Sequence, residues 1–384
     1  MNELPLFYRV KDGPLLDQFI AENFLHEAIR QGKTFAIAEG KFTGGAIINK
    51  ITIPHSTYAF HIGTVVNNKK QKEILLSETY KEKGEAAKIV DQIGKDSPEI
   101  AIEMAKSIKK LRNDDIGIAT TVERTGKGKD IGKLGNLMHV AFSSDSGTIV
   151  KSHFLTNEEL ENSTFLANRV LVDGYEYLTG KSDTSSNSNG IIKEISEPFE
   201  IPELEKLNWE ISDILRFHKL TISSIESCTG GAVADFMTNN FTHYQDFFDS
   251  SWVVYDEQAK EVLGVPSSVM NFGMVYSEKN AEEMAKALRK KTKSHIVIAT
   301  TGVMEAIDTR KYHDDYLPGT VFYAIMVGQE LKTYSLKLDL QRRDLMKKEI
   351  IKAILNELSA QLKQNKKIEG LFQERIERSD YNYW

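Results

Sequence analysis

A serine beside a glycine turn is the first feature of this sequence that could do chemistry. Ser227 follows a β-rich run, Leu220–Ile225, and precedes the turn Thr229-Gly230-Gly231. A strand that turns through glycines into a helix places a hydroxyl where free backbone N–H groups favour a developing oxyanion. Taken alone, such a motif favours a simpler role, the capping of the helix by Ser or Thr. We assign that cap to Thr229, which leaves Ser227 available as a nucleophile.

The neighbouring thiol of Cys228 is a rival nucleophile. A helix N-terminus can lower the pKa of a cysteine and make it reactive. However, adjacent residues at the end of a strand point to opposite sides, so only one of Ser227 and Cys228 can face a cleft. Free cysteine is usually buried. We therefore expect Cys228 to pack in the core, and a cysteine amidase is the least favoured hypothesis.

Tyr255 and Lys260 form the second candidate group. Tyr255 ends the expected strand Ser251–Tyr255, and Lys260 lies about one turn into the next expected helix. A serine hydroxyl needs a base, and a lysine can serve if burial lowers its pKa towards neutrality. A tyrosine hydroxyl could hold or relay the proton. The alternative is that Lys260 is an ordinary solvated lysine.

A third group comprises Thr301 and Gly302 at the end of a strand, and Arg342 and Arg343 before the last helix. A glycine allows close backbone approach, and an arginine fork suits a phosphate. By residue type alone, a surface charge beside Asp344 is the simpler interpretation of the arginine pair.

The histidines give no metal-binding spacing. His313, beside Asp314 and Asp315, lies in a polar stretch typical of a solvated loop. We expect no metal and no cofactor.

The composition bounds the class of protein. The chain has 384 residues, 41% hydrophobic and 27% charged, as in a globular protein of about two domains. Its net charge of −6 argues against a general nucleic-acid surface. Cys228 is the only cysteine, so an intrachain disulfide is excluded. No signal-peptide pattern and no apolar stretch of about 20 residues is present, so we expect a cytoplasmic protein without membrane contact.

The sequence contains one unit written twice. Ala101–Ile108 (AIEMAKSI) matches Ala281–Leu288 (AEEMAKAL), and the run IATT occurs at 118–121 and again at 298–301. Lys181–Gly190 has no apolar residue and is typical of a flexible connector. We predict a first domain over 1–180, a flexible linker over 181–199 and a second domain over 200–384.

Strands that alternate with helices predict an α/β class, two tandem three-layer α/β/α domains, each with a central mixed sheet. The helices expected in the second domain are Asn208–Phe217, Ala232–Met237, Gln258–Leu263, Glu278–Lys290 and Asp344–Leu362. The strands expected there are Leu220–Ile225, Ser251–Tyr255, His295–Thr301, Thr320–Val327 and Lys332–Leu340. The candidate residues follow three of these strands, where α/β proteins usually bind ligands.

The second half resembles a known family. The blocks ESCTGG, VVYDEQAKEVLGV, VYSE, ATTG and PGTVFYA occur in that order between residues 204 and 362. They are similar to the C-terminal domain of the competence/damage-inducible CinA proteins. Stand-alone members of that family are three-layer α/β/α amidohydrolases that deamidate nicotinamide mononucleotide to nicotinate mononucleotide and ammonia.

The resemblance implies a Ser–Lys mechanism acting on a small nucleotide. Ser227 would attack the amide carbon, Lys260 would move the proton, and Tyr255 would assist. Arg343 would bind the 5′-phosphate. The oxyanion and the substrate would be held by Thr229, Gly230, Gly231, Thr301 and Gly302.

Two departures from the family keep a second hypothesis open. After Thr301 the chain reads Gly302-Val303-Met304-Glu305-Ala306 where the family usually has GIAGP. The usual YSNEAK is YDEQAK here, which keeps Tyr255 and Lys260. The alternative function is therefore a non-catalytic nucleotide-binding or scaffold protein.

The first copy lacks the expected catalytic residues. Gly40-Lys41-Phe42 stands where the nucleophile should be, and Asn67 replaces Tyr255, although Lys72 matches Lys260. Glu158 aligns with Arg343 and would repel a phosphate. We expect a non-catalytic first domain that packs on the second as an intrachain pseudo-dimer, and association with further copies stays open.

Overall fold

The structure of the protein is a computed structural model. It describes residues 14–53, 56–82, 84–94, 96–124, 136–180, 203–239, 244–270, 275–304 and 318–364. The predicted linker 181–199 lies outside these residues, as do His313, Asp314 and Asp315. The side chain of Glu158 is also outside the described part.

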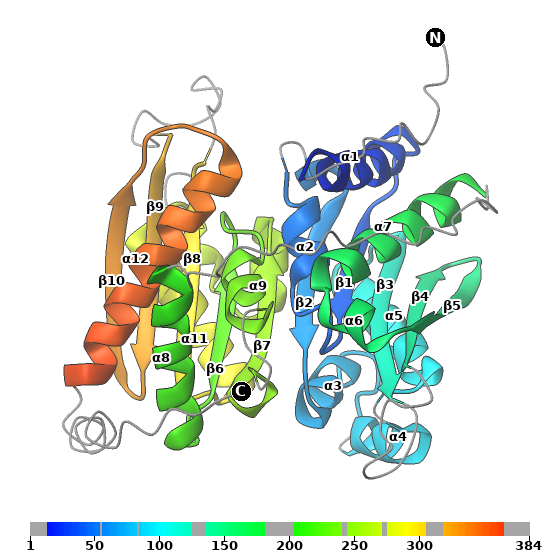
Figure 1. The fold of residues 1–384 in the computed structure, drawn as a ribbon, viewed down its shortest axis with the longest axis horizontal. Coiled ribbons are helices and arrows are strands. Elements are labelled where there is room, and N and C mark those ends of the chain that lie inside the picture. Colours follow the sequence, from blue (N-terminus) through cyan, green and yellow to red (C-terminus); the bar gives the residue numbers. More distant parts are fainter. Residues whose placement is uncertain are drawn as a thin grey trace.

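Ten strands form a single mixed sheet (Figure 1). The strands are β1 (Phe35–Glu39), β2 (Phe60–Val66), β3 (Ile116–Arg124), β4 (Asn136–Ser144), β5 (Gly147–Leu155), β6 (Ile222–Glu226), β7 (Phe248–Val254), β8 (Ile296–Gly302), β9 (Thr320–Val327) and β10 (Glu330–Lys337). Their order is β10-β9-β8-β6-β7-β2-β1-β3-β4-β5. The predicted α/β/α class is confirmed, and the two expected sheets are joined into one.

Each copy of the repeat contributes five neighbouring strands. In both copies three strands run parallel, with the first strand in the middle, and an antiparallel hairpin extends the sheet outward. The copies meet where β2 and β7 pair antiparallel, with Thr64 opposite Trp252. The repeat alignment pairs these two residues as equivalents, so the junction is built like an isologous contact.

Helices cover both faces of the sheet (Figure 1). One face carries α1 (Pro14–Arg30), α2 (Ala46–Ile51), α6 (Asn157–Glu161) and α7 (Ser163–Thr179) from the first copy, and α8 (Glu203–Phe217), α9 (Ala232–Asn239) and α12 (Arg343–Gln364) from the second. The other face carries α3 (Lys69–Leu76), α4 (Glu85–Ile93), α5 (Pro98–Arg112), α10 (Glu257–Val262) and α11 (Glu278–Thr292). The core on this second face is continuous between the copies, with Ile62 and Trp252 both fully buried in it. Three short 3₁₀ turns complete the described elements, η1 (Ser56–Tyr58), η3 (Tyr244–Asp246) and η4 (Ser267–Val269).

Most predicted elements of the second copy are confirmed to within two or three residues. The strand predicted to begin at Ser251 begins at Phe248 instead, and its polar residues Ser250 and Ser251 are fully buried. Serines gave no strand signal, but both faces of this strand are covered because it lies at the centre of the joined sheet. The predicted strand Lys332–Leu340 is found at Glu330–Lys337, an exposed edge strand.

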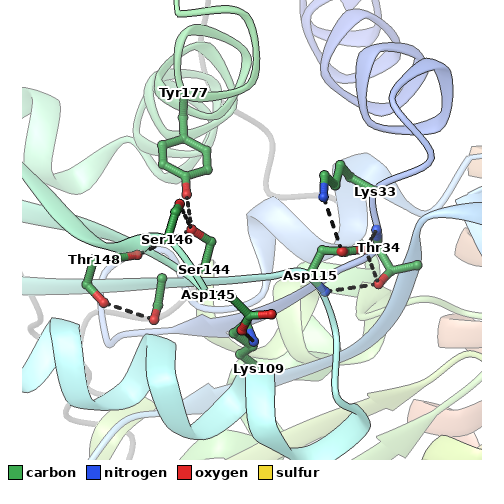
Figure 2. Close-up of polar contacts among 11 residues, drawn as sticks. Lys33, Thr34, Lys109, Asp115, Ser144, Asp145, Ser146, Thr148 and Tyr177 are labelled. Atoms are coloured by element: carbon green, nitrogen blue, oxygen red, sulfur yellow. Dashed lines mark hydrogen bonds and ion pairs between the residues drawn. The ribbon is translucent and has the colours of Figure 1, made fainter.

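Polar contacts hold the amino ends of neighbouring parallel strands in each copy. Figure 2 shows Thr34 against Asp115, between the starts of β1 and β3. The Thr34 amide donates to Asp115 Oδ2 (2.9 Å), and the Asp115 amide donates to Thr34 Oγ1 (3.1 Å). The second copy repeats the arrangement with Thr221 and His295. These contacts fix the relative heights of the strands, and in the second copy the other ends of β6 and β8 carry candidate residues.

Candidate active site

Ser227 lies directly after β6, at the carboxyl ends of the parallel strands of the second copy. Its amide donates to the carbonyl of Thr300 in β8 (3.0 Å), which extends the pairing of the two strands by one residue. The residue is buried, with 7% of its surface exposed. The chain then turns through Gly230, whose amide donates to the Ser227 carbonyl (3.1 Å), before α9 begins. Ser227 is therefore held rigidly on its backbone side.

Glu226, the residue before the serine, caps the helix that follows. Its carboxylate accepts the amides of Val233 (3.1 Å) and Ala234 (3.0 Å) at the start of α9. The Thr229 hydroxyl donates to the same carboxylate (2.7 Å), so the prediction that Thr229 caps α9 is wrong. A buried carboxylate is stabilised by these donors and by the helix dipole. Its signal in the sequence was the acidic residue present in both copies, Glu39 and Glu226.

The two turn glycines are explained by contact with the first copy. Both have positive φ, +59° at Gly230 and +89° at Gly231. A Cβ on Gly230 would lie 2.2 Å from Thr52 Oγ1, and one on Gly231 would lie 3.3 Å from Ile48 Cγ2. These glycines thus allow the backbone to come close to α2 and to Thr52 after it. The sequence predicted a close approach to a ligand instead.

Lys260 lies in α10, which follows the strand next to β6. Its side chain is almost completely buried, with 2% of the residue exposed. Burial lowers the pKa of the Lys260 amine to about 8, against the opposing effect of Glu257 and Asp256. No ion pair to the Lys260 ammonium is found among the described residues. The alternative of an ordinary solvated lysine is therefore excluded.

Tyr255 and Arg343 meet beside the serine turn. Arg343, the first residue of α12, donates from Nη2 to the Tyr255 hydroxyl (2.7 Å) and to the Cys228 carbonyl (3.2 Å). Since the tyrosine oxygen accepts this hydrogen bond, its own proton stays available to donate. The interpretation of Arg343 as a mere surface charge fails, whereas Arg342 is exposed and pairs with Asp344.

The Cys228 thiol is poorly suited to nucleophilic attack. The residue is 5% exposed, as expected for a packed cysteine. Burial raises the pKa of the thiol to about 12, and the cations of Arg343 and Lys260 offset this only in part. Because the thiolate is the reactive form, a cysteine mechanism is disfavoured at neutral pH.

Thr301 and Gly302 end β8 beside the turn, and both have structural roles. The Thr301 hydroxyl donates to the Val275 carbonyl (3.1 Å). A Cβ on Gly302 would lie 2.6 Å from the Thr320 carbonyl oxygen, so the glycine is required by the neighbouring strand β9. Val303 and Met304 are buried after it, while Glu305 and Ala306 lie outside the described residues.

Lys347 is a residue near the site that sequence reasoning missed. It lies one turn after Arg343 in α12 and donates to Asn49 Oδ1 (2.7 Å) and Thr52 Oγ1 (3.0 Å) of the first copy. Burial lowers the pKa of its amine to about 7, and Arg343 adds to this effect. The helical spacing of Arg343 and Lys347 was the available signal, but the partner came from a segment nearly 300 residues away.

The corresponding place in the first copy has a different chemistry. Gly40 follows β1, and its amide donates to Thr120 Oγ1 (2.9 Å). Lys72 is buried like Lys260, but its ammonium pairs with Asp96 (2.9 Å). Asn67, at the position of Tyr255, donates to the Phe248 carbonyl (3.3 Å).

These features define a duplicated α/β/α protein with one complete set of candidate residues, in the second copy. The chain belongs to the CinA C-terminal domain family, whose profile matches residues 17–172 and again residues 204–362. The family predicted from the sequence is therefore confirmed, and the match to both copies confirms the repeat.

Two relatives illustrate the extent of the similarity. A CinA-like protein of Flavobacterium psychrophilum is 40% identical over 124 residues, which are 32% of this chain and 29% of that protein. A CinA-like protein of Syntrophus aciditrophicus is 32% identical over 163 residues, 40% of this chain and 38% of that protein. The chain thus spans about a third of the length of the curated relatives that it matches.

Solved structures give matches of the same kind. Competence damage-inducible protein A of Klebsiella pneumoniae is 22% identical with a TM-score of 0.39, and the match covers 43% of this chain and 99% of that one. A competence or damage-inducible protein of Enterobacter asburiae is 26% identical with a TM-score of 0.37, and the match covers 42% of this chain and 99% of that one.

The described part of the chain contains no helix with the length and apolar composition that a membrane span requires.

Proposed function

We propose that the second copy is an amidohydrolase that converts nicotinamide mononucleotide into nicotinate mononucleotide and ammonia. One observation carries the proposal, a fully buried Lys260 whose pKa is lowered to about 8, one strand away from Ser227. About a tenth of such an amine is neutral at pH 7, which is enough for general-base catalysis.

The reaction would proceed in two steps. In the first, neutral Lys260 takes the proton of the Ser227 hydroxyl while the Ser227 oxygen attacks the carboxamide carbon. The tetrahedral intermediate breaks its C–N bond, and Lys260 returns the proton to the leaving ammonia. In the second, neutral Lys260 takes a proton from water as the water oxygen attacks the ester carbon. The ester C–O bond then breaks, Lys260 returns the proton to the Ser227 oxygen, and nicotinate mononucleotide is released. Tyr255 donates a hydrogen bond within this relay.

The oxyanion donors can be narrowed by the contacts of the turn. The Gly230 amide is bonded to Ser227, and the Thr301 hydroxyl is bonded to Val275. The amides of Cys228, Thr229 and Gly231 have no acceptor among the described residues. We therefore assign the oxyanion to these three amides, at the positive end of α9.

Arg343 is the proposed phosphate ligand. Its Nη2 already donates to the Tyr255 hydroxyl and the Cys228 carbonyl. Its Nε is buried and has no hydrogen-bond partner within the described part of the chain. A phosphate oxygen at this position would satisfy that donor. The hydrogen bond from Arg343 to the Cys228 carbonyl places the proposed phosphate ligand beside the turn that carries the proposed nucleophile.

The test measures ammonia and nicotinate mononucleotide from purified protein and nicotinamide mononucleotide, over a pH range that brackets the pKa of Lys260. We expect turnover by the wild type and by Cys228→Ala, and loss of turnover in Ser227→Ala. Turnover that survives Ser227→Ala would refute the nucleophile. Binding of the nucleotide without turnover at any pH would establish the alternative, a non-catalytic nucleotide-binding protein.

A further inference from the structure

The segments that carry the proposed site are held by residues of the first copy. Phe60 packs against Tyr255 with ring centroids 6.2 Å apart, and the Tyr255 amide donates to the His61 carbonyl (3.2 Å). This hydrogen bond extends the pairing of β7 with β2 by one residue beyond Val254. The next residue, Asp256, makes the contact on which the inference depends.

Asp256 binds on two sides at once. Its Oδ1 accepts the amide of Ala259 (2.7 Å), so it is the N-cap of α10, the helix that contains Lys260. Its Oδ2 accepts Arg112 Nη2, from the end of α5 in the first copy. The Arg112 side chain is 9% exposed, so the ion pair is shielded from water on the arginine side. The N-cap of the lysine helix is thus tied to the other copy.

Among the described residues, the aligned positions of the other copy form no equivalent ion pair. Asn68, which aligns with Asp256, caps α3 by accepting the Gln71 amide (3.0 Å). The residue that aligns with Arg112 at the end of α11 is Thr292, whose hydroxyl donates to Leu288 within its own helix (3.1 Å). At these aligned positions, an ion pair to the N-cap side chain is therefore found only for the helix that contains Lys260. In the reverse direction Lys70 Nζ of α3 donates to the Thr292 carbonyl (3.4 Å), which does not involve the N-cap.

We propose that Arg112 is a positioning residue for the amidohydrolase site, which acts by fixing Asp256 and, through it, the helix that carries Lys260. The inference rests on the proposed function for its catalytic consequence, but its structural part does not require turnover. With the arginine in place, the negative charge of the Asp256 carboxylate is paired, and the carboxylate is held at the helix N-terminus. Without it, the carboxylate is uncompensated four residues before the lysine, and α10 is free to move.

The test follows the titration of the Lys260 amine itself. Full-length protein is labelled with trace acetic anhydride at a series of pH values, and acetylation of the Lys260 peptide is quantified by mass spectrometry. Arg112→Met should move the labelling midpoint to higher pH by roughly half a unit or more, because an unpaired carboxylate favours the charged amine. Asp256→Asn keeps a capping side chain, removes the carboxylate and should move the midpoint the other way.

A matched control removes another ion pair between the copies. Lys291 of α11 pairs with Glu78 after α3 (2.8 Å), away from the serine turn. Lys291→Met should leave the Lys260 midpoint unchanged, although it also breaks a contact between the copies. With nicotinamide mononucleotide as substrate, Arg112→Met should lower kcat about tenfold and shift the acid limb of the pH profile, whereas Lys291→Met should do neither.

Two results would overturn the inference. One is a Lys260 midpoint that is the same in wild type and Arg112→Met when both are folded by circular dichroism. The other is an equal shift in Arg112→Met and Lys291→Met, which would reduce Arg112 to a cohesive contact. If Arg112→Met does not fold, Asp256→Asn breaks the same pair from the other side, and an unchanged midpoint there has the same meaning. Absence of turnover in the wild type would count against the proposed function and leave this labelling result decisive.

Discussion

The two copies bury equivalent lysines and treat them differently. Lys72 in the first copy is paired with Asp96, whereas Lys260 forms no ion pair among the described residues, and Tyr276 stands at the position that aligns with Asp96. A carboxylate partner keeps an ammonium charged, and a buried site without one favours the neutral amine. The same scaffold thus holds one buried lysine in an ion pair and the other without one among the described residues. On the proposed mechanism, the residue before the neighbouring helix, Asp96 or Tyr276, decides whether the lysine is a structural cation or a proton acceptor.

The largest expected effect separates the two lysines directly. Lys260→Met should lower kcat by about 10²–10⁴-fold, the usual contribution of a general base. Lys72→Met should leave kcat within about twofold, because the first copy has no serine for a base to act on. Steady-state ammonia release from both variants tests this, with thermal unfolding as the folding control. Equal losses would mean that the first copy takes part in the chemistry.

Removal of the proposed phosphate ligand, Arg343, should lower kcat/KM more for a phosphorylated substrate than for an unphosphorylated one. Arg343→Met removes hydrogen bonds to a charged group, worth about 1.5–3 kcal/mol, so kcat/KM for nicotinamide mononucleotide should fall roughly ten- to a hundredfold. The unphosphorylated riboside should be affected much less, with any residual loss reporting on Tyr255, which Arg343 also binds. Equal loss for both substrates would show that Arg343 acts only through the tyrosine.

The pH dependence follows from the lowered pKa of Lys260. In the proposed mechanism the neutral amine is the base, so kcat/KM should rise with pH and level off above about 8. Between pH 6 and pH 8 the neutral fraction, and hence kcat/KM, should increase about fiftyfold. Tyr276→Asp introduces a carboxylate at the position that aligns with Asp96 and should move this limb, the rise of kcat/KM with pH, to higher pH. A limb unchanged in Tyr276→Asp would contradict the comparison between the two lysines.

The smallest expected effect uses the reciprocal threonines of the interface. Thr52 Oγ1 donates to the Gly230 carbonyl (3.0 Å) in the serine turn, and Thr238 Oγ1 donates to the equivalent Gly44 carbonyl (2.7 Å). Each Thr→Val change should cost about 1 kcal/mol of unfolding free energy. Only Thr52→Val should also lower kcat, by roughly three- to tenfold, because only it loosens the turn at Ser227. Similar activities in the two variants would separate the interface from catalysis.

The sequence was sufficient for the class of fold, the repeat and the family, because strand-helix alternation and matching blocks are local signals. It was insufficient for the role of Glu226, since an acidic residue at a strand end looks solvated until the helix amides are seen around it. The contacts of Gly230 with Thr52 and of Lys347 with Asn49 join segments far apart in the chain, which no local pattern encodes. The candidate residues Ser227, Lys260, Tyr255 and Arg343 could be proposed from the motif, but only the structure shows that Lys260 is buried.

The most direct test of the central claim is the capture of an acyl-enzyme on Ser227. Protein is mixed with nicotinamide mononucleotide, quenched in acid within the first turnovers, and digested for peptide mass spectrometry. The account predicts a nicotinoyl-nucleotide ester on the peptide containing Ser227, absent from Ser227→Ala, with no adduct on any peptide of the first copy. An adduct on Cys228, or ammonia release without any adduct under conditions that trap other acyl-enzymes, would contradict it.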